Sequence, residues 1–359
     1  MNAVFDTQVV LMEQTAGTRP FVSVIIPIYN EEAYIAKALS AVLKQDYPPD
    51  RFEIIIADGL STDGTRKIIA SFQGKHPNIR LIDNPQRIVP TGLNQAIACA
   101  RGEIIVRLDG HCEYPNDYVR RVAELRQRME ADNVGGVLVP VGNTYVQKAV
   151  AAAYYSRVGF GGYALKGSNE AGKIREVDTV HGGCWKRERL LEVGGFDEEM
   201  VRNQDDELSF RLRKRSGRIF QSLDLRVLYH VRSSFKKLFL QFAQYGYWKV
   251  QVVRKHPKQA SIRHIVPALF VSGLVVLLVG SLFSGVFVRL FALLTTGYLW
   301  ILSLSSMIQT WRGQRNLWPG LVYALALMHL GYGSGFILGT LRTLFGSLPT
   351  DSFFEKTSR

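Results

Sequence analysis

A carboxylate and an imidazole stand two residues apart where an apolar run ends, since Asp109 and His111 follow the segment 104–108. In an extended segment the side chains of residues i and i+2 lie on the same face. Both side chains can therefore bind one ion, and a divalent cation there suits a ligand that carries a diphosphate. Imidazole favours Mn²⁺ over the all-oxygen ligand set that Mg²⁺ prefers. We expect a divalent cation, Mn²⁺ or Mg²⁺, at this position.

Strand and helix patterns alternate in the segment that must position these residues. Apolar strands are predicted at 21–27, 52–57, 79–82 and 103–108, and helices at 31–44, 65–72 and 92–100. Buried strands separated by helices predict an α/β fold with a parallel sheet covered on both faces. Ligands of such sheets bind beyond the carboxyl ends of the strands. The chain has neither GxGxxG nor GxxxxGK[ST], which argues against a dinucleotide dehydrogenase and a P-loop NTPase.

The last hundred residues contain three apolar segments, at 265–288, 290–311 and 316–341, which have no Asp, Glu, Lys or Arg and a single histidine, His329. Each approaches or exceeds the ~20 residues that span a bilayer. Basic residues precede the first segment and follow the second, so both of these ends are expected in the cytoplasm. The third segment then places the C-terminus outside, unless the glycine-rich stretch 331–335 makes it re-entrant. We expect a multi-pass protein of the inner (plasma) membrane with a cytoplasmic catalytic domain.

Composition supports this organisation. The formal net charge of +13 fits positive charge near a bilayer, and the basic residues are not interleaved with an aromatic platform, so nucleic acid is not an expected partner. Three cysteines without a CxxC pair fit a reducing cytoplasm. The segment 233–263 is rich in aromatic residues and lysine and predicts a pair of interfacial helices. The expected order is a short leader at 1–20 without a signal peptide, a catalytic domain at 21–232, the interfacial segment 233–263, a membrane region at 264–345 and a tail at 346–359.

Several motifs occur in a recognisable order: residues 27–32 (PIYNEE), 57–65 (ADGLSTDGT), Asn94 with 100–103 (ARGE), 109–111 (DGH), 193–197 (VGGFD) and 204–208 (QDDEL). Together they resemble the inverting glycosyltransferases of family 2, which have the GT-A fold, a Rossmann-like nucleotide-sugar domain. The resemblance covers residues 21–232. It implies a UDP-sugar donor and transfer with inversion at the anomeric carbon.

The resemblance also implies donor-binding residues: Pro27, Tyr29, Glu31, Asp58, Arg87 and Asp109. Tyr29 would stack on the uracil ring, with a packing aromatic as the alternative. Asp58 would accept the uracil imide N–H, or else serve as a turn residue before Gly59. Arg87 would pair with a phosphate or the base, or else stay solvated.

The metal and acceptor sides follow from the same resemblance. Asp109 and His111 match a DxH variant of the DxD motif, found in the polypeptide N-acetylgalactosaminyltransferases, and His230 stands where that variant supplies a second histidine. Asp205 matches the aspartate of the Glu-Asp motif and is the expected catalytic base, with Asp206 and Glu207 as rivals. On the acceptor side the sequence points to Asp206 and to Trp185, which would be a sugar-stacking face or else a core tryptophan.

The whole layout resembles the succinoglycan-type exopolysaccharide glycosyltransferases of bacteria. This implies that a hexose, with glucose expected, moves to a polyprenyl-diphosphate-linked saccharide at the lipid bilayer through a β linkage. Two alternatives remain open. One is an enzyme that places a single sugar on polyprenyl phosphate, and the other is a non-catalytic membrane protein that binds nucleotide sugars.

Overall fold

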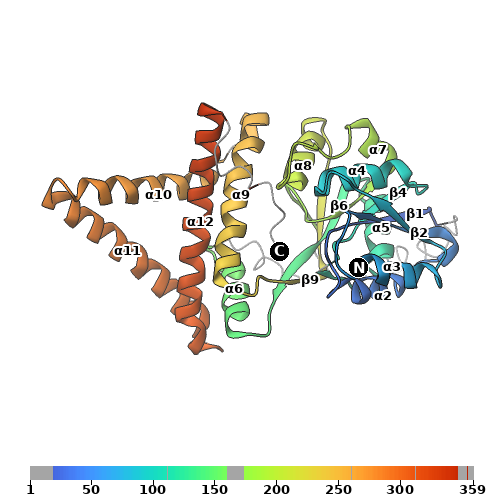
Figure 1. The fold of residues 1–359 in the computed structure, drawn as a ribbon, viewed down its shortest axis with the longest axis horizontal. Coiled ribbons are helices and arrows are strands. Elements are labelled where there is room, and N and C mark those ends of the chain that lie inside the picture. Colours follow the sequence, from blue (N-terminus) through green and yellow to red (C-terminus); the bar gives the residue numbers. More distant parts are fainter. Residues whose placement is uncertain are drawn as a thin grey trace, which may run out of the picture.

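The computed structural model describes residues 19–110, 112–159, 174–259, 261–311, 313–346 and 354. A domain built on one sheet lies beside a group of long helices (Figure 1). The strands are β1 (Val22–Ile28), β2 (Phe52–Asp58), β3 (Ile79–Asp83), β4 (Ile104–Arg107), β5 (Cys112–Glu113), β6 (Asn133–Val141), β7 (Ile174–Glu176), β8 (Gly183–Lys186) and β9 (Ile219–His230). The helices of this domain are α2 (Ile35–Leu43), α3 (Thr65–Gln73), α4 (Val89–Cys99), α5 (Tyr118–Arg128), α6 (Tyr145–Tyr155), α7 (Arg187–Glu192) and α8 (Gln204–Lys214).

The sheet has the order β3-β2-β1-β4-β8-β6-β9-β5, with β7 paired to β9. The four predicted strands are confirmed and run parallel, β1 pairing with β2 and β4, and β2 with β3. The other half of the sheet is mixed, because β8 runs antiparallel to β4 and β6 while β6 and β9 are parallel. The prediction of a parallel sheet therefore holds for the nucleotide-binding half only.

Both faces of the sheet are covered, as the continuous apolar strands predicted. Alternate residues of β1 enter different cores: Val24 and Ile26 belong to the larger cluster, whereas Ile25 belongs to a second cluster with Leu93 and Phe196. This alternation follows from the two-residue period of a strand.

A buried carboxylate explains one of the sequence motifs. Glu53 in β2 has a fully buried side chain and accepts hydrogen bonds from Ser23 Oγ (2.6 Å) and from the backbone N–H of Arg101 (2.7 Å). Ser23 Oγ in turn accepts from Gly102 N (2.8 Å). A Cβ on Gly102 would lie 2.5 Å from Ser23 N, so this turn needs glycine. The ARGE segment therefore anchors the start of β4.

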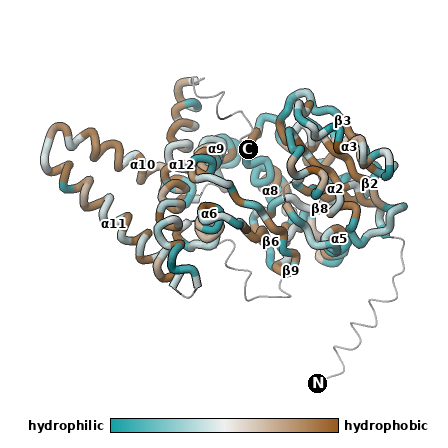
Figure 2. Tube along the Cα trace, turned by 60° about the horizontal axis from the view of Figure 1, so that its bottom comes forward, coloured by the Kyte–Doolittle hydropathy of each residue, from teal (hydrophilic) through white to brown (hydrophobic). Residues whose placement is uncertain are grey.

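Three long apolar helices follow the catalytic domain: α10 (Ile262–Gly280), α11 (Gly285–Thr310) and α12 (Trp318–Phe345). Each is long and apolar enough to cross a membrane, and α10 and α11 form a protruding hairpin coloured as hydrophobic (Figure 2). The first segment was predicted to run to residue 288, but α10 ends at Gly280. Ser284 Oγ accepts a hydrogen bond from Val286 N and begins α11, as serine commonly does at a helix start.

Two other predictions change in this region. The expected pair of interfacial helices is one helix, α9 (Phe235–Lys255), followed by a 3₁₀ turn at Pro257–Gln259. The glycine-rich stretch of the third segment lies inside the continuous helix α12 rather than in a re-entrant loop. Glycines four residues apart, Gly331, Gly335 and Gly339, face α9, and a Cβ on Gly335 would overlap the carbonyl oxygen of Ala243. Small residues at this spacing let two helix backbones approach closely, as seen for α9 and α12 in Figure 1.

Candidate active site

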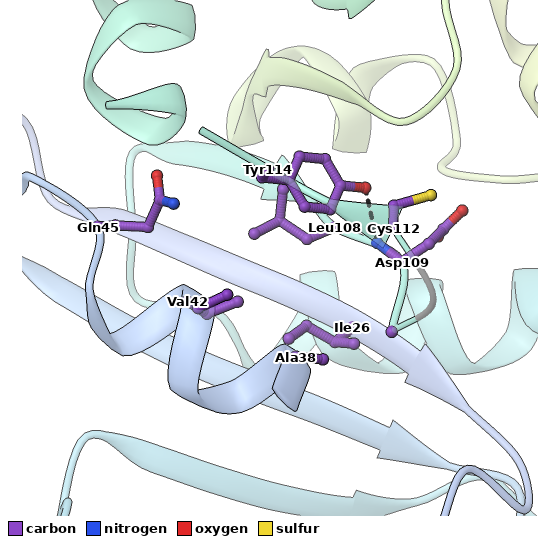
Figure 3. Close-up of a pocket in the computed structure, with 10 residues that line it drawn as sticks. Ile26, Ala38, Val42, Gln45, Leu108, Asp109, Cys112 and Tyr114 are labelled. Atoms are coloured by element: carbon purple, nitrogen blue, oxygen red, sulfur yellow. Dashed lines mark hydrogen bonds between the residues drawn. The ribbon is translucent and has the colours of Figure 1, made fainter. Parts of the chain in front are cut away.

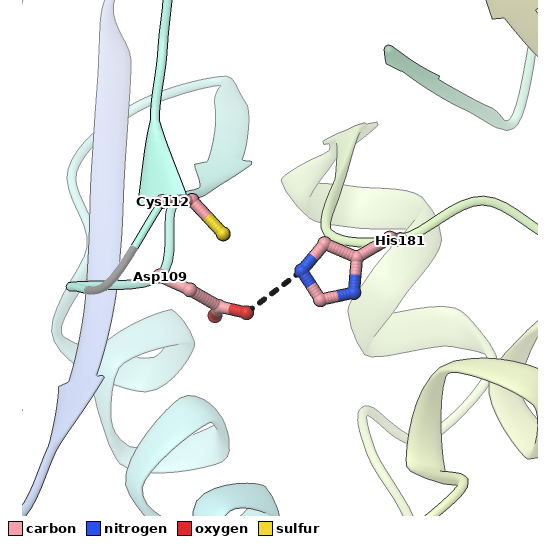
Figure 4. Close-up of side chains that lie close together, drawn as sticks. All are labelled: Asp109, Cys112 and His181. Atoms are coloured by element: carbon pink, nitrogen blue, oxygen red, sulfur yellow. Dashed lines mark ion pairs between the residues drawn. The ribbon is translucent and has the colours of Figure 1, made fainter. Parts of the chain in front are cut away.

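The carboxyl end of β4 carries Asp109 into a cluster with Cys112 and His181 (Figure 4). His181 Nε2 lies 2.9 Å from Asp109 Oδ2, and one ligand atom from each of the three residues lies within 4.8 Å of the others. Strand register explains the approach: Arg107 pairs with Gly183 in the antiparallel β4–β8 ladder. Continuing this register by two residues sets Asp109 opposite His181.

Hydrogen bonds between its own residues stabilise the turn after β4. Asp109 N donates to Tyr114 Oη (2.9 Å), a contact drawn in Figure 3, and Cys112 N donates to the carbonyl of Asp109 (3.2 Å). Burial raises the pKa of Tyr114 well above its usual value. The tyrosine therefore stays a neutral phenol that fixes the backbone of Asp109.

Arg107 connects the two carboxylates of the site. Its Nε lies 3.0 Å from Asp109 Oδ1, and its Nη1 lies 2.5 Å from Asp205 Oδ1. The Arg107 side chain is only 5% exposed, so the pairs form away from solvent. Burial alone would lower the pKa of Arg107, but the charges of Asp109 and Asp205 raise it above its usual value. A buried arginine of this kind is always charged and orients both carboxylates.

Asp205 is placed by contacts between α4, α8 and the turn at Gly194–Phe196. Asn94 on α4 accepts a hydrogen bond from Phe196 N and donates to Phe196 O, both at 2.8 Å. Arg211 on α8 donates to the carbonyls of Val193 (2.6 Å) and Gly195 (2.7 Å). Gly195 has φ of 67°, and a Cβ there would lie 2.5 Å from Asn94 Oδ1. The VGGFD motif therefore holds α8 against α4 through Arg211, which lies six residues after Asp205 on the same helix.

The three acidic residues at the start of α8 point to different partners. Asp205 contacts Arg107, whereas Asp206 Oδ2 lies 2.5 Å from Lys249 Nζ on α9. Glu207 is buried and pairs with Arg211 (2.7 Å) and His256 (3.0 Å). Of the three, Asp205 alone contacts the Arg107 side chain that also holds Asp109.

Burial and charge set the protonation of this cluster. Burial raises the pKa of Asp205 above its ordinary value, and the Arg107 charge partly opposes the rise. Burial alone would lower the pKa of His181, but the Asp109 carboxylate outweighs it and raises that pKa well above its usual value. A carboxylate with a raised pKa has the property that a general base needs near neutral pH.

A second part of the site lies beyond β1 and β2. Gly59 sits between Tyr29 and Arg87: a Cβ there would lie 3.1 Å from Tyr29 Cδ2 and 3.5 Å from Arg87 Cα. The Arg87 guanidinium carbon is 6.0 Å from the centroid of the Tyr29 ring, and Arg87 is exposed. A half-buried ring beside an exposed cation suits a planar base and its phosphates.

The backbone is strained around this region. Asn30, Leu60, Arg87 and Asn203 have φ between 52° and 61°, a conformation that costs non-glycine residues of order 1 kcal/mol or more. Asn30 and Leu60 stand two residues after the ends of β1 and β2, and Asn203 precedes α8. Such strain concentrates at binding and catalytic sites.

Two of the remaining predicted donor residues lie deeper. Asp58 has a fully buried side chain and accepts from Ser61 Oγ (2.5 Å) and Arg66 Nη1 (2.7 Å), which matches the turn role considered for it. Pro27 lies within β1 opposite Ala57. Glu31 is buried, and its backbone N–H donates to Thr65 Oγ1 (2.8 Å). Asp58 and Glu31 are thus buried, whereas Pro27 is half-buried like Tyr29.

Of the predicted metal ligands that the structure describes, Asp109 alone belongs to the cluster with Cys112 and His181. His111 lies outside the described residues. His230 ends β9 and pairs with Glu113 at 2.7 Å, one residue beyond the Cys112–Tyr229 strand pair. Carboxylate oxygen and imidazole nitrogen fit Mn²⁺, whereas a thiol is a softer ligand than Mn²⁺ or Mg²⁺ prefers. Asp109 with imidazole nitrogen therefore fits a divalent cation, and Cys112 adds little to such a site.

Trp185 needs a correction. It was considered for a sugar-stacking face, but its side chain is 1% exposed and packs edge-on against Phe196, with ring centroids 5.9 Å apart. Gly182 (φ 65°) and Gly183 (φ 141°) make the turn that inserts β8 between β4 and β6 and carries Trp185 into the core. Trp185 is thus the core tryptophan of the alternative prediction.

Two residues of the cluster, Arg107 and His181, were not recognised as site residues from the sequence. Arg107 is the lone charge in the apolar strand directly before Leu108-Asp109. His181 precedes the two glycines of the turn into β8. Both positions carried a local signal, but their approach to Asp109 depends on the pairing of β4 with β8.

Comparisons with known proteins agree with this architecture. The family model described as "Glycosyl transferase family 2" matches residues 23–184. The succinoglycan biosynthesis protein ExoA of Rhizobium meliloti is 31% identical over 317 residues, 87% of this chain and 93% of that protein. A dolichyl N-acetyl-alpha-D-glucosaminyl phosphate 3-beta-D-2,3-diacetamido-2,3-dideoxy-beta-D-glucuronosyltransferase of Methanococcus voltae is 31% identical over 247 residues, 66% of this chain and 74% of that protein.

Among solved structures, the mannosyltransferase PcManGT of Pyrobaculum calidifontis, in complex with GDP-Man and Mn²⁺, has a similar fold. The TM-score is 0.58 at 24% identity, covering 87% of this chain and 88% of that one. This likeness concerns the fold, a mixed sheet with helices of the GT-A type followed by apolar helices. The relationship to ExoA over nearly the full length, together with the family model, shows that the chain belongs to glycosyltransferase family 2.

Proposed function

We propose that this protein is an inverting, metal-dependent glycosyltransferase that moves a hexose from a UDP-sugar to a polyprenyl-diphosphate-linked saccharide at the cytoplasmic face of the inner membrane. The observation that carries the proposal is the Arg107 bridge between Asp109 and Asp205. It holds a candidate cation ligand and a candidate base within one cluster, at the sheet edge next to Tyr29 and Arg87.

In this proposal the nucleotide lies against Tyr29, with its diphosphate near Arg87 and Asp109. A divalent cation held by Asp109 and imidazole ligands, for which His111, His181 and His230 are the candidates, would neutralise charge on the leaving diphosphate. His181 would bind such a cation only as a neutral imidazole, releasing its proton as the cation binds. Asp205 accepts the proton of the attacking hydroxyl, which enters opposite the leaving group. Inversion follows because this is a single in-line displacement.

The acceptor class is supported by the apolar helices and by the names of relatives. Three helices could cross a membrane, and the relatives in Rhizobium meliloti and Methanococcus voltae are named for succinoglycan biosynthesis and for a dolichyl-phosphate-linked sugar. The charge pattern around α10 and α11 supports a cytoplasmic catalytic domain. Glucose is the proposed sugar by likeness to the succinoglycan protein.

The test uses membranes that contain the overexpressed chain and a panel of radiolabelled UDP-sugars, with a GDP-sugar as the nucleotide control. Each is incubated with Mn²⁺ or with EDTA, and the lipid extract is counted and weighed by mass spectrometry. The proposal expects label from one UDP-hexose, dependent on metal, in a lipid that carries a diphosphate and at least two sugars. Label in a monophosphate-linked single sugar would instead support the polyprenyl-phosphate alternative.

The same panel of UDP-sugars, with purified lipid acceptor added, distinguishes the proposed enzyme from a non-catalytic protein that binds nucleotide sugars. Nucleotide-sugar binding without transfer to any lipid acceptor would contradict the proposed activity. The pairing of Asp205 with buried Arg107 favours the enzyme, since a protein that only binds nucleotide sugar has no need of a base on the acceptor side.

A further inference from the structure

A cavity of about 390 Å³ lies where the catalytic domain meets the apolar helices. Four separate segments contribute to its wall: the stretch before β8, helix α8, helix α9 and the chain from the 3₁₀ turn into α10. The lining residues are Asp178, Thr179, Asp206, Phe210, Arg213, Lys249, Lys258, Arg263 and His264. The cavity is therefore built by the fold at the boundary of two regions rather than by one loop.

Positive charge exceeds negative charge in this cavity. Its lining includes four arginine or lysine side chains against two aspartates. Both aspartates are already paired, Asp206 with Lys249 at 2.5 Å and Asp178 with Arg213 at 2.8 Å. Lys258 has no carboxylate within ion-pair distance among the residues that the structure describes, and Arg263 approaches only the already paired Asp178, at 3.9 Å. The cavity therefore suits an anion with several oxygen atoms.

The position of the cavity connects the proposed base with the membrane. Asp206 directly follows Asp205, and Thr179 lies two residues before His181, so one wall adjoins the catalytic cluster. Arg263, in the first turn of the apolar candidate membrane span α10, lines the same cavity and lies 3.9 Å from Asp178. The cavity is therefore lined both by neighbours of the catalytic cluster and by the start of an apolar helix.

We propose that this cavity binds the diphosphate of the lipid-linked acceptor. The inference rests on the proposed function and adds the place where its acceptor is held. Lys258 and Arg263 contact the diphosphate oxygens, the polyprenyl chain leaves along α10, and the saccharide extends past Asp206 toward Asp205. Lys249 holds Asp206 away from the diphosphate.

The experiment measures binding of a short-chain polyprenyl diphosphate without sugar to the purified full chain in detergent, by calorimetry, so neither UDP-sugar nor transfer is required. The double variant Lys258→Gln/Arg263→Gln removes the two cations proposed to contact the ligand. Both side chains are exposed, so folding should persist, and the melting temperature checks it. The matched control is Lys236→Gln/Lys237→Gln, two exposed lysines in the first turn of α9. They lie ~18 Å along the helix from the cavity-lining Lys249, at 1.5 Å per residue.

The proposal expects an affinity about tenfold lower for the double variant and within about twofold of wild type for the control. The charge-preserving variant Lys258→Arg/Arg263→Lys should bind like wild type. Equal losses in the test and control variants would overturn the proposal, because diffuse surface charge would then explain binding. Equal binding of the corresponding polyprenol, or displacement by phosphatidylglycerol at matched concentration, would overturn it as well, the latter in favour of a phospholipid headgroup.

A transfer assay then separates this inference from the proposed function. If the acceptor site is correct, the double variant raises KM for the lipid acceptor and leaves KM for the UDP-sugar within about twofold. Selective binding of the diphosphate with no sugar transfer in any variant would support the cavity assignment while contradicting the proposed activity. Sugar transfer with an acceptor KM that neither substitution changes would support the proposed activity and contradict the cavity assignment.

Discussion

The substitution Asp205→Asn tests the proposed base without removing the hydrogen bond that holds the side chain in place. Asparagine has nearly the same shape, and its Oδ1 can still accept the hydrogen bond from Arg107, whose second partner Asp109 is unchanged. The substitution therefore removes the proton acceptor while keeping the bridge. Loss of a general base costs about 10²–10⁴-fold in rate, which corresponds to about 3–5 kcal/mol in the activation free energy.

The assay compares kcat for sugar transfer with affinity for UDP in wild type, Asp205→Asn and Asp206→Asn. The last is the matched control, because it makes the same chemical change one residue later, at a side chain that contacts Lys249 instead of Arg107. We expect kcat to fall by about 10²–10⁴-fold for Asp205→Asn and by less than about tenfold for Asp206→Asn. UDP affinity should be unchanged in both.

The pH dependence gives a second reading of the same residue. Because burial raises the pKa of Asp205, a proton occupies the base as the pH falls through that raised value, and kcat of the wild type should fall with it. The residual activity of Asp205→Asn should lack this acidic limb. A variant that keeps turnover within tenfold of wild type, with the acidic limb intact, would refute the assignment of Asp205 as the base.

Three further predictions follow from buried charges and from the metal. Replacing Arg107 with Gln leaves two buried carboxylates without their cation. The acidic limb of kcat should therefore move to higher pH, and the folded state should lose about 3 kcal/mol, measured as a lower melting temperature. An unchanged pH profile would contradict the role of Arg107 in bridging Asp109 and Asp205. Glu53→Gln should destabilise by about 2 kcal/mol near neutral pH. Hydrogen bonds from Ser23 and Arg101 outweigh burial and lower the pKa of Glu53, so this difference should be full above the ordinary glutamate value and vanish as pH falls through the lowered one; a difference that persists in acid would speak against it. Asp109→Asn should abolish Mn²⁺ binding measured by electron paramagnetic resonance, and His230→Ala should weaken it about tenfold, whereas undiminished binding in both would place the cation elsewhere.

The nucleotide-binding half of the fold could be predicted because its signals are local. Buried apolar strands and amphipathic helices between residues 21 and 108 reveal both the elements and the edge where ligands bind. The mixed half of the sheet carries no such signal: β8 is short, and the pairing that sets Asp109 opposite His181 comes from a register between segments more than seventy residues apart. Long-range pairing of this kind is decided by tertiary packing.

The same contrast holds for single residues. Asp205 was predicted from its motif. The buried arginine that orients it, Arg107, was marked in the sequence only by being the single charged residue of an apolar strand. From the sequence, a core position and a sugar-contacting position were equally expected for Trp185. The insertion of β8 between β4 and β6 buries its side chain in the core. The glycine-rich composition around Gly335 was compatible with a re-entrant loop. In the structure Gly331, Gly335 and Gly339 lie four residues apart on one helix and allow close packing against α9.

The most direct measurement is sugar transfer by the purified full chain from a radiolabelled UDP-hexose to a synthetic polyprenyl-diphosphate-linked saccharide, with Mn²⁺ and with EDTA. The proposed function predicts a lipid product heavier by one hexose, formed only with metal, with a β linkage by nuclear magnetic resonance. Tight UDP binding without transfer to this acceptor, or transfer to polyprenyl phosphate alone, would contradict it.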